Sequence, residues 1–172
     1  QEKKPLDHSV YDSWESLSGV SVPYNGKYMF YSVNKQEGDA ILYIYNLATG
    51  EQISIPRGKS PVISVDGQTL LYRIAPQYSE TRDAKIKKKK GDDMPKDTLV
   101  IMNLKSGEKQ VFPRLKGVKY GRELQQYIAF QTSPEPAKKG EKKPTADKSA
   151  GTHLYLMNIK TSKLDTIDIV EK

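Results

Sequence analysis

The stretch LYIYNLATGE at residues 42–51 recurs as LVIMNLKSGE at 99–108 and as LYLMNIKTSK at 154–163. Each copy begins with an apolar, β-prone run and ends in a turn signal. In the first two copies Gly50 and Gly107 can supply the positive φ that a tight hairpin needs. The third copy has serine at that position, so its turn is expected to be less well specified. Because a second strand-like run follows each turn, every copy predicts a β-hairpin.

A further recurrence lies upstream of each copy, as NGKYMFYSV (25–33), DGQTLLYRI (66–74) and ELQQYIAFQT (123–132). The first two begin with Asn-Gly and Asp-Gly, which are the strongest short hairpin signals. Short strand-like pieces precede them and would pair across these turns. Each unit therefore has the order strand, tight turn, strand, variable insert, strand, tight turn, strand.

Three such units predict an all-β fold, a partial β-propeller of about three four-stranded antiparallel blades with long basic inserts. A sandwich of ordinary hairpins is the alternative. The predicted parts of this one incomplete propeller domain are an N-terminal arm (1–13) and blade-like units at 14–60, 61–117 (insert 75–97) and 118–172 (insert 133–152). Propellers usually close with about 4 to 8 blades, so we expect the N-terminal part of a longer protein rather than a self-associating partial ring.

The net charge of +7 is concentrated in the inserts. Residues 82–97 hold seven Lys or Arg against four Asp, and residues 135–148 hold five Lys against three acidic residues, so both stretches are expected to be basic loops. The run KIKKKK at 85–90 contains no aromatic residue for base stacking. Nucleic-acid binding through these lysines is therefore the least favoured of the functions considered. The sequence has no run of about 18 apolar residues that would predict a membrane span.

The order of these motifs resembles the start of the propeller domain in prolyl oligopeptidase family serine peptidases, particularly bacterial, exported members. The resemblance covers nearly the whole chain. It is carried by YDSWESLSGVSVPYNGKYMFYSV (11–33), SVDGQTLLYRIAP (64–76) and AKIKKKKGDDMPKDTLVIMNL (84–104). It implies a hydrolase domain with a Ser-Asp-His triad further along a parent polypeptide, beneath a propeller that admits short or unfolded peptides. It also favours the periplasm, although the residues themselves leave a cytoplasmic location open.

A search for catalytic residues within the chain finds none. Ser21 and Ser60 lie in GVSVP and GKSPV, near misses of the G-x-S-x-G nucleophile motif that lack its final glycine. His8 and His153 are isolated, and without cysteine they predict no metal site. The acidic pair at 92–93 follows four lysines, so charge neutralisation is its expected role. No cofactor motif occurs.

Two features remain as candidates for contact with substrate or partner. Trp14, the single tryptophan, is expected to anchor the first blade, with a place at the rim of a peptide channel as its alternative role. The lysine run is the second candidate, and its members are Lys87, Lys88, Lys89 and Lys90. The sequence thus predicts a non-catalytic propeller portion that serves a C-terminal α/β-hydrolase domain and peptide substrates. A stand-alone module that binds a peptide or protein is the alternative.

Overall fold

The structure, a computed structural model, describes residues 14–121, 124–133 and 153–167. The predicted arm at 1–13, His8 within it, and positions 134–152 of the third insert lie outside these residues. The described chain is mostly β, and it forms two antiparallel sheets in which strands adjacent in sequence are paired.

The first sheet has four strands in sequence order. They are β1 (Glu15–Ser21), β2 (Tyr28–Lys35), β3 (Ile41–Asn46) and β4 (Gln52–Pro56). The second sheet has seven strands. They are β5 (Gly58–Ile63), β6 (Thr69–Ile74), β7 (Asp97–Asn103), β8 (Lys109–Tyr120), β9 (Tyr127–Thr132), β10 (Leu154–Asn158) and β11 (Lys163–Ile167).

The long strand β8 joins two four-stranded units. Its first half pairs with β7 and its second half with β9, and both ladders meet at Leu115. The backbone turns at Arg114, where φ is 57°, just as it turns at Arg57 (φ 60°) between β4 and β5. The described chain therefore contains three four-stranded units. We call them blade one (β1–β4), blade two (β5 to the first half of β8) and blade three (the second half of β8 to β11).

Two apolar clusters hold the blades together. The cluster between blades one and two consists of Phe30, Leu42, Ile44, Ile55, Ile63, Leu70, Tyr72, Val100 and Met102. The cluster between blades two and three consists of Leu71, Leu99, Ile101, Leu115, Leu124, Ile128, Phe130, Met157 and Ile159. Alternate residues of β6 and β7 enter opposite clusters, because successive strand side chains point to opposite faces. Blade two is thus covered on both faces, as blades stacked face to face require, and the predicted partial propeller is confirmed.

The tight turns have the predicted positions and a common hydrogen-bond pattern. Asn46, Asn103 and Asn158 each accept, through Oδ1, the N–H groups of the residues two and three positions further on. Such Asx turns fix the chain reversal. The third turn keeps the same conformation although Ser162 takes the place of glycine, and φ there is 58°. That conformation is costly for a residue with a β-carbon.

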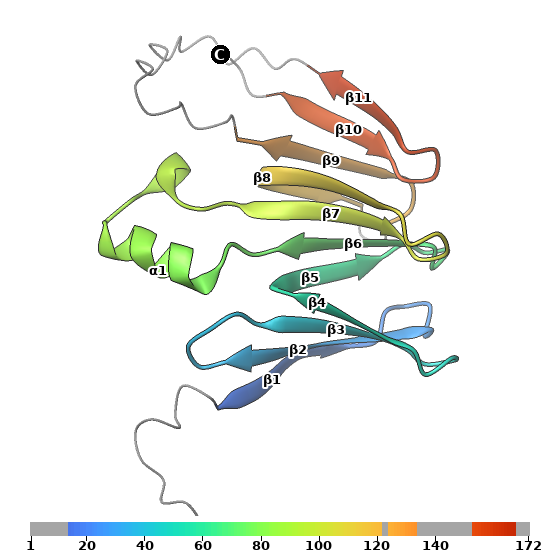
Figure 1. Cartoon of the computed structure of the whole chain (residues 1–172). Coiled ribbons are helices and arrows are strands. Elements are labelled where there is room, and N and C mark those ends of the chain that lie inside the picture. Colours follow the sequence, from blue (N-terminus) through green and yellow to red (C-terminus); the bar gives the residue numbers. More distant parts are fainter. Residues whose placement is uncertain (1–13, 122–123, 134–152, 168–172) are drawn as a thin grey trace, which may run out of the picture.

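The tight turns lie at one end of the strands, and the inserts of blades one and two lie at the other end (Figure 1). The expectation that residues 82–97 form a loop is wrong in part, because the insert of blade two contains the helix α1 (Tyr78–Ile86) and a 3-10 turn η2 (Gly91–Asp93). Residues 87–90 and 94–96 lie in turns or irregular segments, as expected. Glu80 in the first turn and Lys85 in the last complement the helix dipole. The N–H of Tyr78 donates to Asp39 Oδ1 at 2.8 Å, so the insert of blade one satisfies the N-terminus of this helix.

Candidate functional site

The lysine run ends the helix α1. The backbone N–H groups of Lys87 and Lys89 donate to the carbonyls of Asp83 and Ala84, at 2.9 and 3.0 Å, while Lys88 takes a φ of 53°. The side chains of Lys87, Lys88, Lys89 and Lys90 are exposed. Cationic residues at this end of a helix are favoured by its dipole. This gives the run a structural role, and its contact with a partner stays a prediction.

Trp14 directly precedes β1, at the end of the strands that bears the inserts. Its side chain is 52% exposed, and its carbonyl accepts a hydrogen bond from the N–H of Gln36 at 3.1 Å. This backbone contact holds the start of β1 against the end of β2. A place at the rim of a channel stays a prediction for this tryptophan.

The serines of the two near-miss motifs lie on the first strands of their blades. Ser21 ends β1, and Ser60 lies in a bulge of β5 with a φ of 51°. The Oγ of Ser60 accepts a hydrogen bond from Nη2 of Arg73 at 2.7 Å. A guanidinium is a donor without acceptor capacity and stays protonated, so this partner cannot serve as a general base for the hydroxyl.

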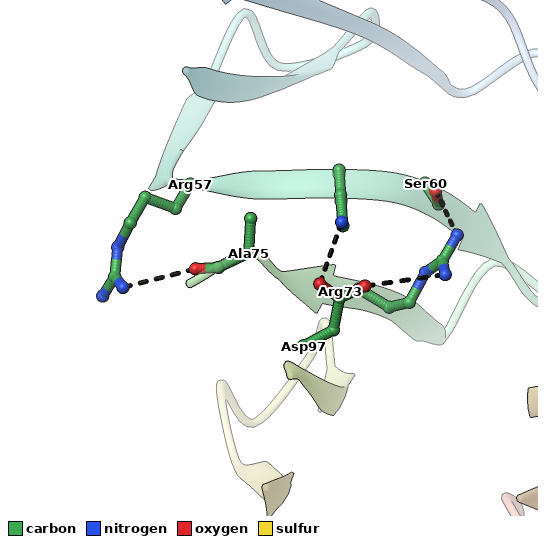
Figure 2. A network of polar contacts seen from close by, with 6 residues as sticks. Arg57, Ser60, Arg73, Ala75 and Asp97 are labelled. Atoms are coloured by element: carbon green, nitrogen blue, oxygen red, sulfur yellow. Dashed lines mark hydrogen bonds and ion pairs between the residues drawn. The ribbon is translucent and has the colours of Figure 1, made fainter. Parts of the chain in front are cut away.

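Ser60 and Arg73 belong to a charged network on blade two (Figure 2). Asp97, at the start of β7, pairs with Lys59 Nζ at 2.9 Å through one oxygen and with Arg73 Nη1 at 3.6 Å through the other. The carboxylate is 19% exposed, and the two cations are more exposed. Two positive charges thus share one negative charge, which leaves the network with one net positive charge.

A cavity of about 580 Å³ lies beside this network, between blades two and three. Arg73 and Ser60 line it from blade two, and Val118 and Phe130, which also contact the cluster between the two blades, line it from blade three. Its apolar walls include Leu71, Val118 and Phe130. Lys119 and Leu154 also touch the cavity, but each is next to a residue that faces blade two (Val118 and Tyr155), so their side chains point to the opposite face of blade three. The described lining contains no Asp or Glu, but Arg73, the cation of that lining whose side chain faces the cavity, is paired with Asp97.

The sequence reasoning missed Arg57 and Arg114, which occupy corresponding places between successive blades. The Arg57 carbonyl accepts the N–H of Ala75 at 2.8 Å. The Nη1 atom of Arg57 donates to the Ala75 carbonyl at 3.3 Å (Figure 2). Arg114 makes the corresponding two bonds with Ser133: its carbonyl accepts the Ser133 N–H at 2.7 Å, and its Nε donates to the Ser133 carbonyl at 3.3 Å. The signal was present in the sequence, because P-R-G-K at 56–59 returns as P-R-L-K at 113–116.

Two ionisable groups of blade two have shifted pKa values. The hydrogen bond from Ser64 Oγ to Asp66 Oδ1, at 2.5 Å, is the main cause that lowers the pKa of Asp66, and the N–H of Gln68 adds to it at 3.0 Å. Burial raises the pKa of Tyr72. Asp66 belongs to the Asp-Gly turn between β5 and β6, so its shift reflects turn formation rather than catalytic chemistry.

Neither a metal site nor a membrane-spanning helix is found among the residues that the structure describes. His153 lies next to Tyr155, with ring centroids 6.5 Å apart. Within 14–121, 124–133 and 153–167, no three His, Cys, Asp or Glu residues gather closely enough to hold a metal ion. No helix in the same residues has the length and apolarity to cross a membrane.

Comparison with known proteins gives matches in structure only. No protein-family model matches the sequence, and no curated protein matches it. An acylaminoacyl peptidase from Pyrococcus horikoshii is 10% identical over 96% of this chain and 27% of its own, with a TM-score of 0.53. This chain thus spans about a quarter of that structure.

Two further structures have a similar likeness. The β-propeller domain of the Trilobed protease from Pyrococcus furiosus, described as having an open velcro topology, is 13% identical over 89% of this chain and 42% of its own, with a TM-score of 0.51. A prolyl endopeptidase structure is 15% identical over 91% of this chain and 23% of its own, with a TM-score of 0.50. The chain therefore has the fold of part of a β-propeller of the kind found in prolyl oligopeptidase family peptidases.

Proposed function

We propose that this chain is the non-catalytic propeller portion of a serine peptidase, where it gates the path of short peptides to an α/β-hydrolase domain outside these 172 residues. The observation that carries the proposal is the fold likeness to an acylaminoacyl peptidase, which extends over 96% of this chain but only 27% of that peptidase. The blade arrangement supports the proposal, because a stack of blades can restrict the access of large substrates to a neighbouring hydrolase domain without taking part in the chemistry.

A fluorophosphonate probe, which reacts with catalytic serines, tests whether the catalytic serine lies outside these 172 residues. The purified chain should remain unlabelled and should not hydrolyse N-acylated peptides. The longer polypeptide that the proposal assumes should be labelled at a serine beyond Lys172 and should hydrolyse them. Labelling of the isolated chain with inhibitor-sensitive turnover would overturn the proposal, and so would a longer polypeptide that the probe leaves unlabelled.

The gating role has its own test in the longer polypeptide. Hydrolysis should fall steeply as peptide substrates are lengthened from short peptides to folded proteins. Gly58→Ala, which disturbs the contact between blades one and two, should reduce the difference in hydrolysis rate between short and long substrates. Equal rates on short peptides and folded proteins in the unmodified polypeptide would contradict gating.

A stand-alone module that binds a peptide or protein is the second candidate. The cavity of about 580 Å³ favours it, because this volume lies within the roughly 300–1,000 Å³ range of small-ligand sites. A stable, closed oligomer of the chain in solution, together with peptide binding, would support this candidate over the first.

The proposal involves no nucleic acid, and it places the protein in the periplasm. Replacing Lys87, Lys88, Lys89 and Lys90 with serine tests the first point, since salt-sensitive retention of DNA or RNA that this change abolishes would contradict it. Cell fractionation tests the second, and recovery of the protein in the cytoplasm alone would contradict it.

A further inference from the structure

The described blades begin and end at the same end of their strands, which we call the insert end. In blade one, Glu15 opens β1 opposite Lys35, the last residue of β2. Pro56 closes β4 opposite Ile41, the first residue of β3, so the insert of blade one adjoins both places. In blade three, β11 likewise ends opposite the start of β10. An even number of antiparallel strands returns the chain to the end at which it started. A domain joined in sequence to these blades therefore emerges at the insert end.

The helix α1 is anchored at this end. Asp39, in the insert of blade one, accepts the N–H of Tyr78 at 2.8 Å, and Ala84 within the helix is 3% exposed. The N–H of Lys88 donates to the Lys85 carbonyl at 2.9 Å, which adds to the two backbone bonds that tie the lysine run to the last turn. The insert of blade two therefore presents its lysines in a defined place.

The lysine run at 87–90 carries charge that the described chain does not neutralise. All four side chains are exposed, and no ion pair joins any of them to another described residue. The acidic residues of the helix, Glu80 and Asp83, precede the run. An acidic surface brought to the insert end would thus meet unpaired positive charge, and complementary charges orient two surfaces in contact.

Exposed apolar side chains accompany these cations. Ile86, next to the run, is 68% exposed, and Trp14, before β1, is 52% exposed. Figure 1 shows α1 and the start of β1 at the same end of the strands. Aromatic residues are enriched in protein interfaces, and interfaces between domains of one chain are more polar than obligate ones. The insert end has this mixed composition.

We propose that the insert end is the surface on which the hydrolase domain docks, with Lys87, Lys88, Lys89 and Lys90 against an acidic patch of that domain. The inference rests on the proposed function, because the hydrolase domain is the partner assumed there. It adds an orientation, in which α1 contacts the hydrolase domain and the tight turns face away from it.

Acetylation of lysines in the longer polypeptide, followed by mass spectrometry, tests this orientation. Lys105 and Lys160, in the tight turns, are exposed like the four lysines of the run, so the blades alone predict similar rates for all six. The docked domain should slow acetylation of the run several-fold relative to Lys105 and Lys160. Equal rates would overturn the proposal, and so would slow acetylation of the tight-turn lysines in place of the run.

Charge reversal tests the acidic contact itself. Lys88→Glu combined with Lys89→Glu should repel the acidic patch, so the remaining lysines of the run should be acetylated faster than in the original polypeptide. Lys105→Glu combined with Lys160→Glu is the matched control and should leave the rates in the run unchanged. Circular dichroism should show the same fold for both variants, because all four substituted side chains are exposed.

A run that stays slowly acetylated after its charge is reversed would overturn the acidic contact. Slow acetylation that disappears on dilution would also overturn the proposal, since a second copy would then cover the run.

These outcomes are separable from those of the proposed function. If the fluorophosphonate probe labels the longer polypeptide while the run reacts as fast as the tight-turn lysines, the docking assignment fails and the peptidase assignment stands. A slowly acetylated run in a polypeptide that the probe does not label would contradict the peptidase assignment, and the insert end would then dock another kind of domain.

Discussion

Arg57 and Arg114 stand 57 positions apart (114 minus 57), and each makes a pair of hydrogen bonds with the residue that follows the second strand of the next blade. In each case the arginine backbone accepts an N–H from the end of the second strand of the next blade, and its guanidinium donates to the carbonyl of the same residue. Each arginine stands at the crossing between two blades and is therefore fixed to the second strand of the blade that follows it.

Substitution of either arginine should loosen this link. Arg57→Ala and Arg114→Ala should each lower the free energy of unfolding by about 1 kcal/mol, because one charged donor is lost. Urea titration measures the change. Arg57→Gly is the matched variant, since it removes the same bond but relieves the positive φ of 60°, and it should be less destabilising than Arg57→Ala. An alanine variant as stable as the original chain would show that the guanidinium bond contributes nothing.

The hairpin turn at Ser162, the third of the repeated turns, can be stabilised by substitution. Ser162 has a φ of 58°, where the first two copies carry Gly50 and Gly107. Ser162→Gly should raise the free energy of unfolding by about 0.5–1 kcal/mol, because glycine adopts this conformation without strain. Gly107→Ser is the reverse control and should lower it by a similar amount. Two changes of the same sign in urea titration would contradict this explanation.

Gly58 is required by close packing between blades one and two. A β-carbon there would lie 2.8 Å from Leu42 Cβ and 2.9 Å from Ile55 Cγ2. Gly58→Ala should therefore lower the free energy of unfolding by about 1–3 kcal/mol, as overpacking does. Gly117→Ala is the control, because open space surrounds that position. Equal effects of the two substitutions on the thermal midpoint would contradict the packing described here.

The turn around Asp66 should make the free energy of unfolding depend on pH in the acidic range. The hydrogen bonds from Ser64 and Gln68 lower the pKa of Asp66 in the folded state below its ordinary value of 3.8. The carboxylate therefore stabilises the fold above that value, and the stabilisation is lost as the pH falls through the lower, folded pKa. The difference in free energy of unfolding between the original chain and Asp66→Asn should be constant from about pH 8 to about pH 5 and should shrink below about pH 4. A difference that stays constant to about pH 2 would contradict this.

The fold could be predicted largely because its signals are local. The motif copies contain the strands and the turns, and alternation within β6 and β7 suits burial on both faces of blade two. The helix α1 is harder to predict, because lysine-rich segments are typical of solvated loops, although Glu80 and Lys85 suit the two ends of a helix. Its N-terminal partner, Asp39, lies 39 residues before Tyr78 (78 minus 39), so no local pattern could reveal it.

The candidate site was less predictable because it depends on register. Arg73 is on β6, Asp97 is on β7, and Ser60 reaches the guanidinium only because β5 is bulged. A shift of one residue would turn Arg73 to the opposite face of the sheet. The sequence contains these residues but does not fix their pairing.

Backbone hydrogen exchange followed residue by residue tests the stacking of three blades most directly. Strands β2, β3, β6, β7, β9 and β10 all have paired neighbours on both sides, so differences among them report on which faces are covered. If blade two is covered by both neighbours, the amides of β6 and β7 will exchange more slowly than the amides of the strands in blades one and three. Exchange in β2 and β3, or in β9 and β10, that is as slow as in β6 and β7 would contradict the three-blade stack.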